Sequence, residues 1–569
     1  MPQKVLVLGS GPIRIGQGIE FDYSCVHCAW ALQDMGYEAI LLNNNPETVS
    51  TDFDTGDALY FEPATLEDVL DVYRRESPIG VAVQFGGQTA INLAQGLHDR
   101  GLNILGTSAE AIALAEDRDQ FERLLRRLGI PKPPGRAVRS LSEALEVAEE
   151  IGFPVLVRPS FVLGGRAMEI VFDAEQLRRF YRIAEDESPG QPVLIDKYMQ
   201  GIEAEVDVIS DGEATLVPGV MEHIERAGVH SGDSMAVFPP VNLSDRVISR
   251  MVAAACDLAR EIGVRGLMNI QFVVAPTEGS GGEAVPQILE VNPRGSRTVP
   301  FLAKVTGIPI VDLATRAMMG QGLSELGYES GLWRLDARGR LHGTVPEVQS
   351  KYKGTVLSEA EISRLADGTA VSRSLFSGAP FYAVKAPVFS FQKLARVEPS
   401  LGPEMKSTGE IMGIDSTFEG ALYKSLVASG ISLPTGGVVV ISVNDADKPA
   451  AIEIAKSLSA RGHEIACTGG THRTLQAAGV GSQRVAKISE GSPHLLDLVM
   501  SRRVSLLINT PGTDAETEAE ASRIRRGCIE TGVACITNID TAEALVKALP
   551  FFEDPLGVSC RRLDEYFGQ

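Results

Sequence analysis

The chain has 569 residues, of which 44% are hydrophobic and 22% are charged. This composition is typical of a soluble globular protein, and the length predicts about three or four domains. The formal net charge of −21 argues against nucleic acid as a partner, because phosphate backbones are bound mainly by Lys and Arg. No segment approaches the roughly 20 apolar residues of a membrane helix, and no signal peptide pattern precedes Val5, so we expect a cytoplasmic protein without membrane contact.

Seven cysteines, an odd and sparse number, indicate a reducing compartment. Cys25-Val-His-Cys28 has the form of half a zinc site, but no second pair has metal-ligand spacing. We therefore expect these two thiols to be buried core residues.

The first stretch alternates strand-like and helical patterns, with strands expected at Lys4–Gly9, Glu38–Asn43, Gly80–Gln84 and Asn103–Gly106. This alternation predicts a parallel sheet covered on both faces. The glycine-rich run from Gly9 to Gly18 is similar to a dinucleotide fingerprint, but Arg14 replaces the third glycine. The second strand also ends in Asn43-Asn-Asn-Pro46, with no acidic residue placed for a ribose. We interpret the run as a tight turn with close backbone packing.

The next part of the chain has features that could hold phosphates. A helix is expected from Glu116 to Leu128, and strands at Phe153–Ser160 and Val193–Lys197. Arg158, near the end of the first of these strands, offers a bidentate fork to an anion. Gly164 and Gly165 would let a loop bring backbone N–H groups over phosphates.

Two short apolar runs, Leu267–Val274 and Gln287–Arg294, predict a pair of strands joined by a hairpin loop at residues 276–286. Alternation places Glu290 and Asn292 on one face of the second strand, and Gln271 comes beside them if the strands pair. One carboxylate and two amide oxygens suit Mg²⁺, which takes one or two protein oxygens plus substrate phosphates. The spacing alone leaves a polar patch on a half-buried sheet equally open.

Residues 323–380 have a less ordered pattern, which we interpret as an insertion or linker. A break at Ser432–Gly437 precedes a renewed alternation, with strands expected at residues 438–443, 464–467, 505–509 and 533–537. These residues predict a separate parallel α/β domain.

Neither a P-loop nor a nucleophile elbow occurs in the sequence. The order of Arg158, the Gly164-Gly165 loop, Lys197, Glu203, the Gly228–Ser231 run and the metal trio resembles the ATP-grasp superfamily. Longer stretches resemble the large subunit of carbamoyl phosphate synthase, and more specifically its C-terminal half. These stretches are Gly16–Asp22, Asn45–Asp52, Gln84–Gln88, Arg158–Glu169, Glu222–Asp233 and Gly402–Gly413.

The resemblance covers residues 1–320 and 383–430 well and the C-terminal domain moderately. It implies a multidomain α/β protein with a Rossmann-like pre-ATP-grasp domain, an α+β ATP-grasp domain and a parallel α/β domain similar to methylglyoxal synthase. The boundaries implied are 1–112, 113–322, 323–433 for an insertion and connecting region that completes the catalytic core, and 434–569.

The resemblance also implies roles for individual positions. Arg158 would bind the ATP phosphates, and Lys197, Met199 and Glu203 would hold the adenine and ribose. Gly228, Val229, His230 and Ser231 would line the nucleotide cleft. Gln271, Glu290 and Asn292 would ligate Mg²⁺ or Mn²⁺. Arg294 and Arg297 would face carbamate and the transferred phosphoryl group, with salt bridges beside a carboxylate site as the alternative.

In the C-terminal domain, positions matching the family's nucleotide-effector pocket are Lys448, Thr468, Thr471, Lys487, Asn509 and Thr510. Pro511 departs from the usual hydroxyl residue, which leaves the effector open. Glu225, Asp233 and Glu404 match positions that bind ornithine in some members. A purely structural C-terminal domain is the alternative.

The implied activity is ATP-dependent phosphorylation of carbamate to carbamoyl phosphate, for pyrimidine and arginine biosynthesis. The implied partners are the N-terminal half of the large subunit and a glutaminase subunit that supplies ammonia, in an oligomer. Two alternatives remain. The chain could self-associate and phosphorylate both bicarbonate and carbamate, or it could be a non-catalytic allosteric or scaffold subunit.

Overall fold

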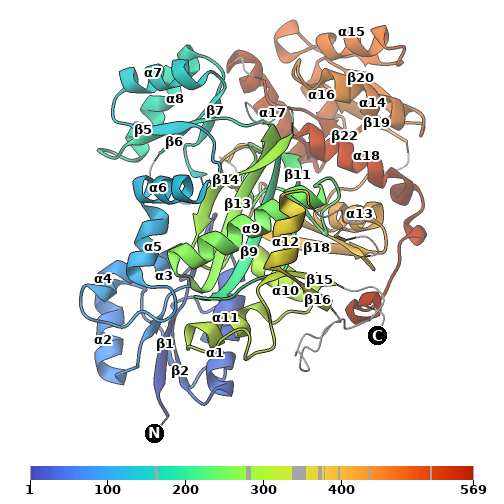
Figure 1. Cartoon of the computed structure of the whole chain (residues 1–569). Coiled ribbons are helices and arrows are strands. Elements are labelled where there is room, and N and C mark those ends of the chain that lie inside the picture. Colours follow the sequence, from blue (N-terminus) through green and yellow to red (C-terminus); the bar gives the residue numbers. More distant parts are fainter. Residues whose placement is uncertain are drawn as a thin grey trace.

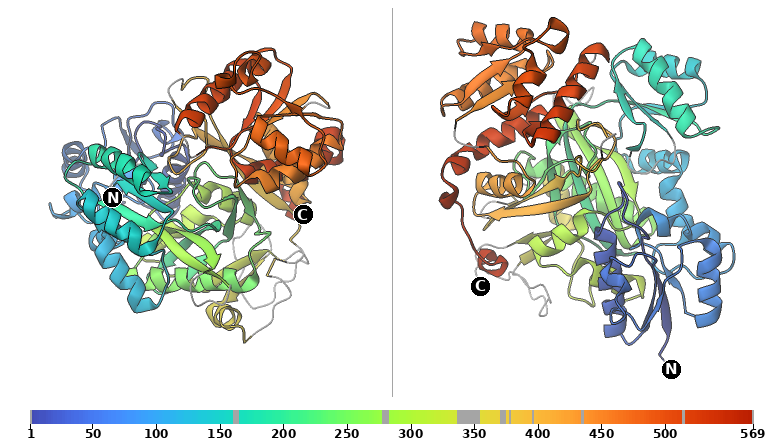
Figure 2. Two further views of the ribbon diagram at one scale, coloured as in Figure 1. Left: turned by 90° about the horizontal axis from the view of Figure 1, so that it is seen from above. Right: turned by 180° about the vertical axis from the view of Figure 1, so that it is seen from behind.

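The computed structural model describes residues 2–159, 165–276, 283–335, 354–369, 375–376, 379–394, 397–433, 436–512 and 515–567. An N-terminal domain, a C-terminal domain and a small α+β unit lie around a central sheet (Figure 1). The N-terminal domain and the C-terminal domain are at opposite ends of the molecule, and a small α+β unit overhangs the central sheet (Figures 1 and 2).

The N-terminal domain has a parallel sheet in the order β3-β2-β1-β4. Its strands are β1 (Lys4–Leu8), β2 (Glu38–Leu42), β3 (Ala58–Tyr60) and β4 (Val81–Ala82). Its helices are α1 (Glu20–Asp34), α2 (Leu66–Glu76), α3 (Gly87–Ile91), α4 (Ala94–His98) and α5 (Ala109–Glu116). The apolar run from Val5 to Leu8 has no exposed side chain, as expected for a parallel strand covered on both faces. The predicted parallel sheet is confirmed, although residues 103–106 contribute only a bridge between Ile104 and Val81.

Cys25 and Cys28 of α1 are buried, free thiols, as predicted. Burial raises the pKa of the Cys28 thiol to about 12, which keeps it protonated and unreactive. Within the described residues, no group of three His, Cys, Asp or Glu side chains could hold a metal ion.

The small unit follows α6 (Arg118–Leu128) and contains an antiparallel sheet in the order β5-β8-β6-β7. Its strands are β5 (Gly135–Val138), β6 (Val155–Pro159), β7 (Glu169–Val171) and β8 (Val193–Lys197), and its helices are α7 (Leu141–Ile151) and α8 (Ala174–Glu187). Side-chain caps fix where these helices begin: Ser140 accepts from the Glu143 N–H, and Asp173 accepts from Glu175 and Gln176. We call this unit the lid. Gly164 lies outside the described residues.

The central sheet has ten strands. Its strands include β9 (Ile202–Asp211), β10 (Thr215–Val217), β11 (Val220–Arg226), β12 (Ala236–Phe238), β13 (Arg265–Pro276), β14 (Ala284–Asn292), β17 (Tyr382–Val388) and β18 (Gly409–Asp415). One face packs on α9 (Asp245–Ile262), and α10 (Thr298–Thr306), α11 (Ile310–Met318) and α13 (Phe418–Ala428) complete the surrounding core. The predicted hairpin is confirmed, but its loop is shorter than residues 276–286, because β13 reaches Pro276 and β14 begins at Ala284. Residues 277–282 lie outside the described part.

Residues 323–380 contain strands of the central sheet, so their interpretation as an insertion or linker is wrong. β15 (Gly331–Leu335) pairs with β10, and β16 (Gly354–Ser358) pairs with β15 at the sheet edge. The helix α12 (Glu359–Ala366) then packs on α9. The strand signal in β15 is short and mixed, and its pairing partner is more than 110 residues away, at Leu216. Part of the basic run at Arg334–Arg340 is outside the described residues.

The C-terminal domain has a second parallel sheet in the order β21-β20-β19-β22-β23, which confirms the predicted renewed alternation. Its strands are β19 (Val438–Ile441), β20 (Glu464–Cys467), β21 (Gln483–Arg484), β22 (Val504–Ile508) and β23 (Ala534–Ile536). Its helices are α14 (Lys448–Ser459), α15 (Gly469–Ala477), α16 (Leu495–Met500), α17 (Ala515–Thr531) and α18 (Ile539–Glu553).

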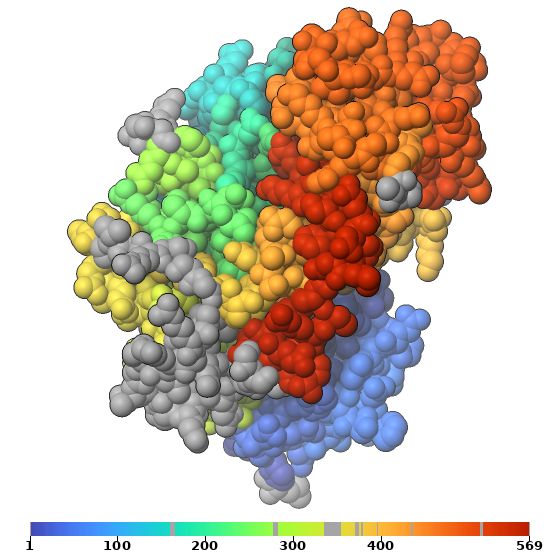
Figure 3. Space-filling model, turned by 90° about the vertical axis from the view of Figure 1, so that its right-hand side faces the viewer, coloured from blue at the N-terminus to red at the C-terminus, as the bar shows by residue number. Residues whose placement is uncertain are grey.

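After α18 the chain runs back over the surface toward the central sheet, as the red segment of Figure 3 shows. The Ser559 N–H donates to Asp415, which also forms a salt bridge with Lys424. Tyr566 is buried beside Phe381. These contacts connect the end of the chain, after the C-terminal domain, to the central core.

No single described helix is long and apolar enough to span a membrane, although α10 and α11, bent by 111°, pass that test as a pair.

Candidate active site

A row of polar side chains crosses the central sheet and faces the lid. It begins on β14 and β13, where Gln271 lies directly opposite Glu290 and Asn269 lies opposite Asn292. Asn292 Nδ2 donates to Glu290 Oε1 at 3.0 Å, and Gln271 Nε2 donates to Ser231 Oγ at 2.9 Å. The structure therefore brings the three predicted metal ligands together on one face. Glu290 is exposed, so its carboxylate is open to a ligand.

These three side chains fit a hard divalent cation that also binds phosphate. They supply one carboxylate and two amide groups, which is a small protein ligand set of the kind that Mg²⁺ completes with water and phosphate oxygens. Softer metals would need nitrogen or sulfur ligands, and the trio has none.

The row continues on β9 with three acids that sequence reasoning did not single out as a group. Glu203, Glu205 and Asp207 alternate along the strand, lie opposite Val273, Gln271 and Asn269, and are all at least nine-tenths buried. Their period-two spacing in an otherwise apolar strand was a readable signal, because it places all three on the face that carries the metal trio.

Buried cations and amides hold these acids. Asn269 Nδ2 donates to Asp207 Oδ1 at 3.1 Å and to Glu205 Oε2 at 3.4 Å. His223 of β11 lies 3.4 Å from Glu205 and 3.5 Å from Glu203. Burial alone would lower the pKa of His223, but its close contacts with the carboxylates of Glu203 and Glu205 outweigh this and raise the pKa to about 9. Burial, reinforced by the charge of Glu205, raises the pKa of Asp207 to about 6.

The loop after β11 covers this polar row. Gly228 has φ +110°, and a Cβ there would lie 2.8 Å from Ile170 of the lid, so only glycine fits. Its N–H donates to Glu203 Oε1 at 3.3 Å. Val229 is buried and His230 is half-buried, and His230 Nδ1 accepts from the Gly232 N–H at 3.0 Å. Burial lowers the pKa of His230, which makes it a neutral ring at pH 7.

The two predicted arginines follow β14 and lie at the inner end of the site. Arg294 Nε donates to Gln88 Oε1 at 3.1 Å and Arg294 Nη2 to Asn292 Oδ1 at 3.3 Å. Arg297 donates to Glu20 at 3.0 Å and to Ser407 Oγ at 3.0 Å. Both arginines therefore contact the N-terminal domain, and Arg294 also contacts Asn292 of the metal face. Arg297 forms a salt bridge with Glu20, as the alternative interpretation expected, whereas the described contacts of Arg294 are hydrogen bonds to neutral groups.

A cavity of about 510 Å³ opens beside Arg297, between α1, α10 and β18. Its polar lining includes Glu20, Arg297, Lys385 and Glu410, and its apolar lining includes Trp30 and Met412. A small charged substrate could reach Arg297 from this side.

On the lid, Arg158 Nε donates to the buried carboxylate of Asp196 at 3.1 Å. Arg118, which sequence reasoning missed, pairs with the same carboxylate. Burial opposes the ionised form of Asp196, but the charges of Arg158 and Arg118 prevail and lower its pKa. Asp196 thus fixes two guanidinium groups side by side, an arrangement suited to phosphates. Arg118 could have been noticed in the sequence because it is the first residue of a helix rich in charged residues.

The predicted adenine and ribose residues lie where the lid joins the central sheet. Lys197 Nζ donates to the carbonyl oxygens of Gly152 at 2.9 Å and Phe153 at 3.1 Å, so its ammonium group is engaged with the end of α7. Met199 packs with Tyr198, Ala227 and Val273 in a small apolar cluster next to Glu203. This apolar cluster could contact a nucleoside base, and the neighbouring Glu203 carboxylate could accept hydrogen bonds from its ribose.

In the C-terminal domain, five of the six predicted effector residues gather at the carboxyl edge of β19, β20 and β22. Thr468 caps α15 and its Oγ1 lies 3.0 Å from Ser442 Oγ, and Thr510 Oγ1 accepts from the Asn444 N–H at 3.0 Å. Asn509 Nδ2 donates to the Ser442 carbonyl oxygen at 2.8 Å, while Thr471 is buried and Lys448 pairs with Asp445 at 2.5 Å. Lys487 follows β21, and its N–H donates to Glu490.

Two of the three positions matched to ornithine binding, Glu225 and Asp233, are hydrogen-bonded within the protein, and Glu404 is exposed. Thr541 Oγ1 donates to Glu225 Oε1 at 2.7 Å, and Asp233 accepts from the N–H groups of Lys406 and Ser407. Burial raises the pKa of Glu225 to about 7.

Comparison with solved structures supports this fold. The biotin carboxylase domain of 2-oxoglutarate carboxylase from Hydrogenobacter thermophilus, solved with MgADP, ADP and bicarbonate, is 18% identical with a TM-score of 0.53, covering 75% of this chain and 90% of that one. Biotin carboxylase from Campylobacter jejuni, solved with an ATP analogue, is 16% identical with a TM-score of 0.51, covering 75% and 91%. At these identities the likeness shows a shared fold.

Three family models match the chain. Residues 1–114 match the carbamoyl phosphate synthase preATP-grasp domain, residues 117–326 match the ATP-binding domain of the carbamoyl-phosphate synthase L chain, and residues 450–537 match the MGS-like domain. The chain thus contains a preATP-grasp domain, an ATP-binding domain of the ATP-grasp type and an MGS-like domain, a combination consistent with a carbamoyl phosphate synthase-like or biotin carboxylase-type large chain.

Proposed function

We propose that this chain phosphorylates carbamate with ATP to give carbamoyl phosphate, as the C-terminal half of a carbamoyl phosphate synthase large subunit. The observation that carries the proposal is the register of β13 and β14. It sets Gln271 against Glu290, with Asn292 beside them and Arg294 two residues on. Arg158 of the lid and Arg118 of α6 share the carboxylate of Asp196.

The reaction forms a bond between a carbamate oxygen and the γ-phosphorus and breaks the bond from that phosphorus to the oxygen of ADP. Little covalent chemistry is asked of the protein, so positioning and charge stabilisation dominate. Bound Mg²⁺ would be held by Gln271, Glu290 and Asn292 and would neutralise charge on the phosphate oxygens.

The chain's own residues supply the remaining steps. Arg294 and Arg297 place positive charge beside the transferred group, and Glu20 with Ser407 fixes the Arg297 guanidinium in direction. The Gly228–Ser231 loop, held by Glu203 and Gln271, closes the site from water. Carbamate decomposes in water, so delivery through the cavity beside Arg297 would protect it.

The proposal includes the partners that such a half requires: an N-terminal half that makes carbamate, a glutaminase subunit, and assembly as an oligomer in the cytoplasm. It includes nucleotide effectors for the C-terminal domain and Mn²⁺ as a substitute for Mg²⁺. The metal face counts against a scaffold role, because a scaffold does not need it.

The test is the reverse reaction, in which the full chain makes ATP from ADP and carbamoyl phosphate. We expect Glu290→Ala to abolish this activity while leaving the unfolding transition unchanged, because Glu290 is exposed and supports no core contact. Glu213→Ala, at an exposed turn after β9, is the matched control and keeps activity. Full activity of Glu290→Ala at saturating Mg²⁺ would rule out the metal assignment. Bicarbonate-dependent ATP hydrolysis by the isolated chain would favour a chain that performs both phosphorylations.

A further inference from the structure

The guanidinium of Arg294 is held in the site by three neutral acceptors. Its Nε donates to Gln88 Oε1 at 3.1 Å. Its Nη1 donates to the Gly295 carbonyl oxygen at 3.0 Å, and its Nη2 donates to Asn292 Oδ1 at 3.3 Å. A guanidinium has five N–H groups, so these contacts leave two of them for the oxygens of an anion.

Close packing in the N-terminal domain fixes the helix α3 that carries Gln88. Gly87 has φ +63°, and a Cβ there would lie 3.0 Å from the ring of Phe21. A Cβ on Gly86 would clash with the backbone of β1. The start of α3 is therefore pressed against β1 and α1. Phe21 also lies under the Arg294 guanidinium, 5.8 Å from the ring centroid, so both partners of this arginine come from one packed region.

The other end of the Gln88 amide is anchored as well. Its Nε2 donates to Glu116 Oε1 at 3.0 Å and to Asn92 Oδ1 at 2.9 Å. Glu116 is the last residue of α5, and Asn92 follows α3. Both N–H groups and the carbonyl oxygen of the amide are thus used. A flipped amide would set Nε2 against the Arg294 donor and Oε1 against the Glu116 carboxylate, so these partners determine its orientation.

Gln88 is a neutral group between a carboxylate and a guanidinium. Among the described residues no carboxylate forms a salt bridge with Arg294, whereas Arg297 pairs with Glu20 at 3.0 Å. A carboxylate in direct contact with Arg294 would neutralise much of its charge and compete with an anionic substrate. The amide of Gln88 transmits the anchor at Glu116 to the guanidinium without placing a negative charge on it.

We propose that Gln88 is a positioning residue for phosphoryl transfer. It fixes the direction of the Arg294 guanidinium and leaves the positive charge and two N–H groups of this arginine for the anionic substrate. The N-terminal domain then contributes to the chemistry of the site as well as to its support. The inference rests on the proposed function for the identity of the anion, which is carbamate with the transferred phosphoryl group.

The experiment measures kcat and the KM for ADP of the full chain in the reverse reaction. Gln88→Leu removes the amide, so Arg294 loses the acceptor that orients its Nε. We expect kcat to fall at least about tenfold and the KM for ADP to stay within about twofold of the wild type. Gln88→Glu keeps the shape but sets a carboxylate against Arg294, so kcat should fall at least as far. Thermal unfolding of both variants reports whether they fold.

A double-mutant cycle separates positioning of Arg294 from a general structural role. Lysine has no Nε–H fork for Gln88 to orient. In the Arg294→Lys background, Gln88→Leu should therefore lower the residual kcat by less than about twofold. A residue that only supports the fold would cost the same factor in both backgrounds.

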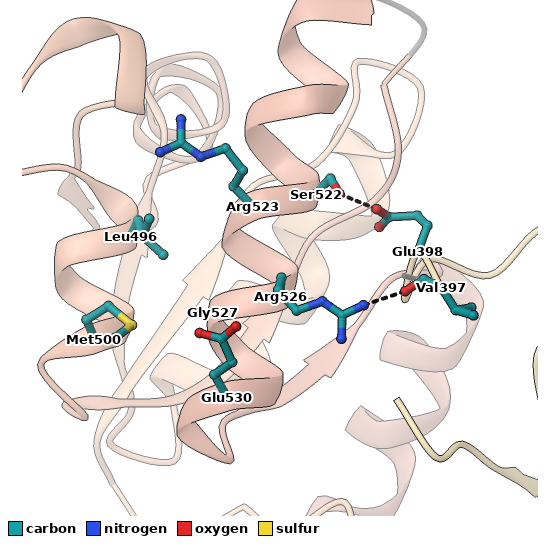
Figure 4. A pocket seen from close by; sticks show the side chains of 9 residues that line it. All are labelled: Val397, Glu398, Leu496, Met500, Ser522, Arg523, Arg526, Gly527 and Glu530. Carbon is teal, nitrogen blue, oxygen red and sulfur yellow. Dashed lines mark hydrogen bonds between the residues drawn. The ribbon is translucent and has the colours of Figure 1, made fainter. Parts of the chain in front are cut away.

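The matched control lies in the C-terminal domain. Ser522 of α17 donates to the carboxylate of Glu398 (Figure 4). Glu398 also accepts from Arg525 at 2.8 Å. Ser522→Ala therefore removes one hydrogen bond from a half-buried side chain beside an arginine, outside the metal face. It should leave kcat and the KM for ADP within about twofold of the wild type.

The inference is overturned if kcat of folded Gln88→Leu stays within about twofold of the wild type, if the loss is equal in both backgrounds, or if only the KM for ADP changes. Failure of the proposed function gives a different result, because the wild type then makes no ATP. In that case crystal structures of the wild type and Gln88→Leu decide. The inference requires the Arg294 guanidinium to leave its wild-type position in the variant, and an unmoved guanidinium overturns it.

Discussion

The buried amide of Asn269 offers the sharpest test of the polar row beneath the metal trio. Asn269 is 2% exposed and donates to two buried carboxylates, Asp207 and Glu205. Replacement by Leu keeps the number and branching of the side-chain heavy atoms but removes both hydrogen bonds. Each carboxylate keeps other partners, His223 for Glu205 and Thr298 for Asp207.

The expected loss of stability follows from those two bonds. A hydrogen bond to a charged group contributes about 1.5–3 kcal/mol, and the added apolar contact of Leu returns about 1 kcal/mol. The Asn269→Leu change should therefore lower the free energy of unfolding by about 2–5 kcal/mol at pH 8.

The loss should shrink in acid. The folded-state pKa of Asp207 is raised above its usual value to about 6, mainly by burial, so its ionised form already destabilises the fold as pH rises through this value. Removing Asn269 raises the pKa of Asp207 further. Below about pH 6 Asp207 is protonated, so the loss of the Asn269 donor costs less stability than at pH 8. Urea unfolding at pH 5 and pH 8 measures the difference.

The control is Asn242→Leu. Asn242 is exposed, and its amide also donates to a carboxylate, Glu222, at 2.6 Å. Glu222 keeps three backbone N–H donors, so this change should cost less than about 1 kcal/mol. A loss below about 0.5 kcal/mol in Asn269→Leu, or a loss that does not depend on pH, would refute the reasoning.

Three further changes test neighbouring parts of the site. Because the pKa of His223 is raised to about 9, its protonated form should add stability that is fully present below about pH 6.5 and lost as pH rises through 9. His223→Gln should reduce the dependence of the unfolding free energy on pH in this range. An unchanged dependence would count against the ion pairs. Gly228→Ala should weaken ADP binding at least tenfold in calorimetry, because its φ of +110° and the contact with Ile170 exclude a Cβ, whereas unchanged binding would mean that the loop tolerates displacement. Arg297→Lys should lower kcat for the reverse reaction about 10²-fold with little change in the KM for ADP, and an effect on KM alone would assign Arg297 to binding.

The metal face was accessible from sequence because its signals are local. Alternation within one strand fixed Glu290 and Asn292 on a common face, and a hairpin with a short loop brought Gln271 opposite Glu290. The same rule applied to Glu203, Glu205 and Asp207 would have found the rest of the row, but the stretch begins with Lys197 and the acid at Glu203, which suggested a turn rather than a strand.

Contacts between distant segments were not accessible from sequence. Arg525 meets Glu398 across 127 residues, and Arg226 meets Asp540 across 314. Neither arginine has a local pattern that names its partner, because a charged residue on a helix or strand is as often a solvated side chain. β15 was missed for the same reason, since its strand character depends on pairing with β10.

The most direct test of the account is transfer of ³²P from carbamoyl phosphate to ADP by the purified wild-type chain in the presence of Mg²⁺. The account predicts labelled ATP in amounts that depend on Mg²⁺ and on Glu290. Acetyl phosphate, which lacks the carbamoyl amine, should be a poor donor. Release of labelled inorganic phosphate with no labelled ATP, under conditions where ADP binds, would contradict a carbamate-phosphorylating site.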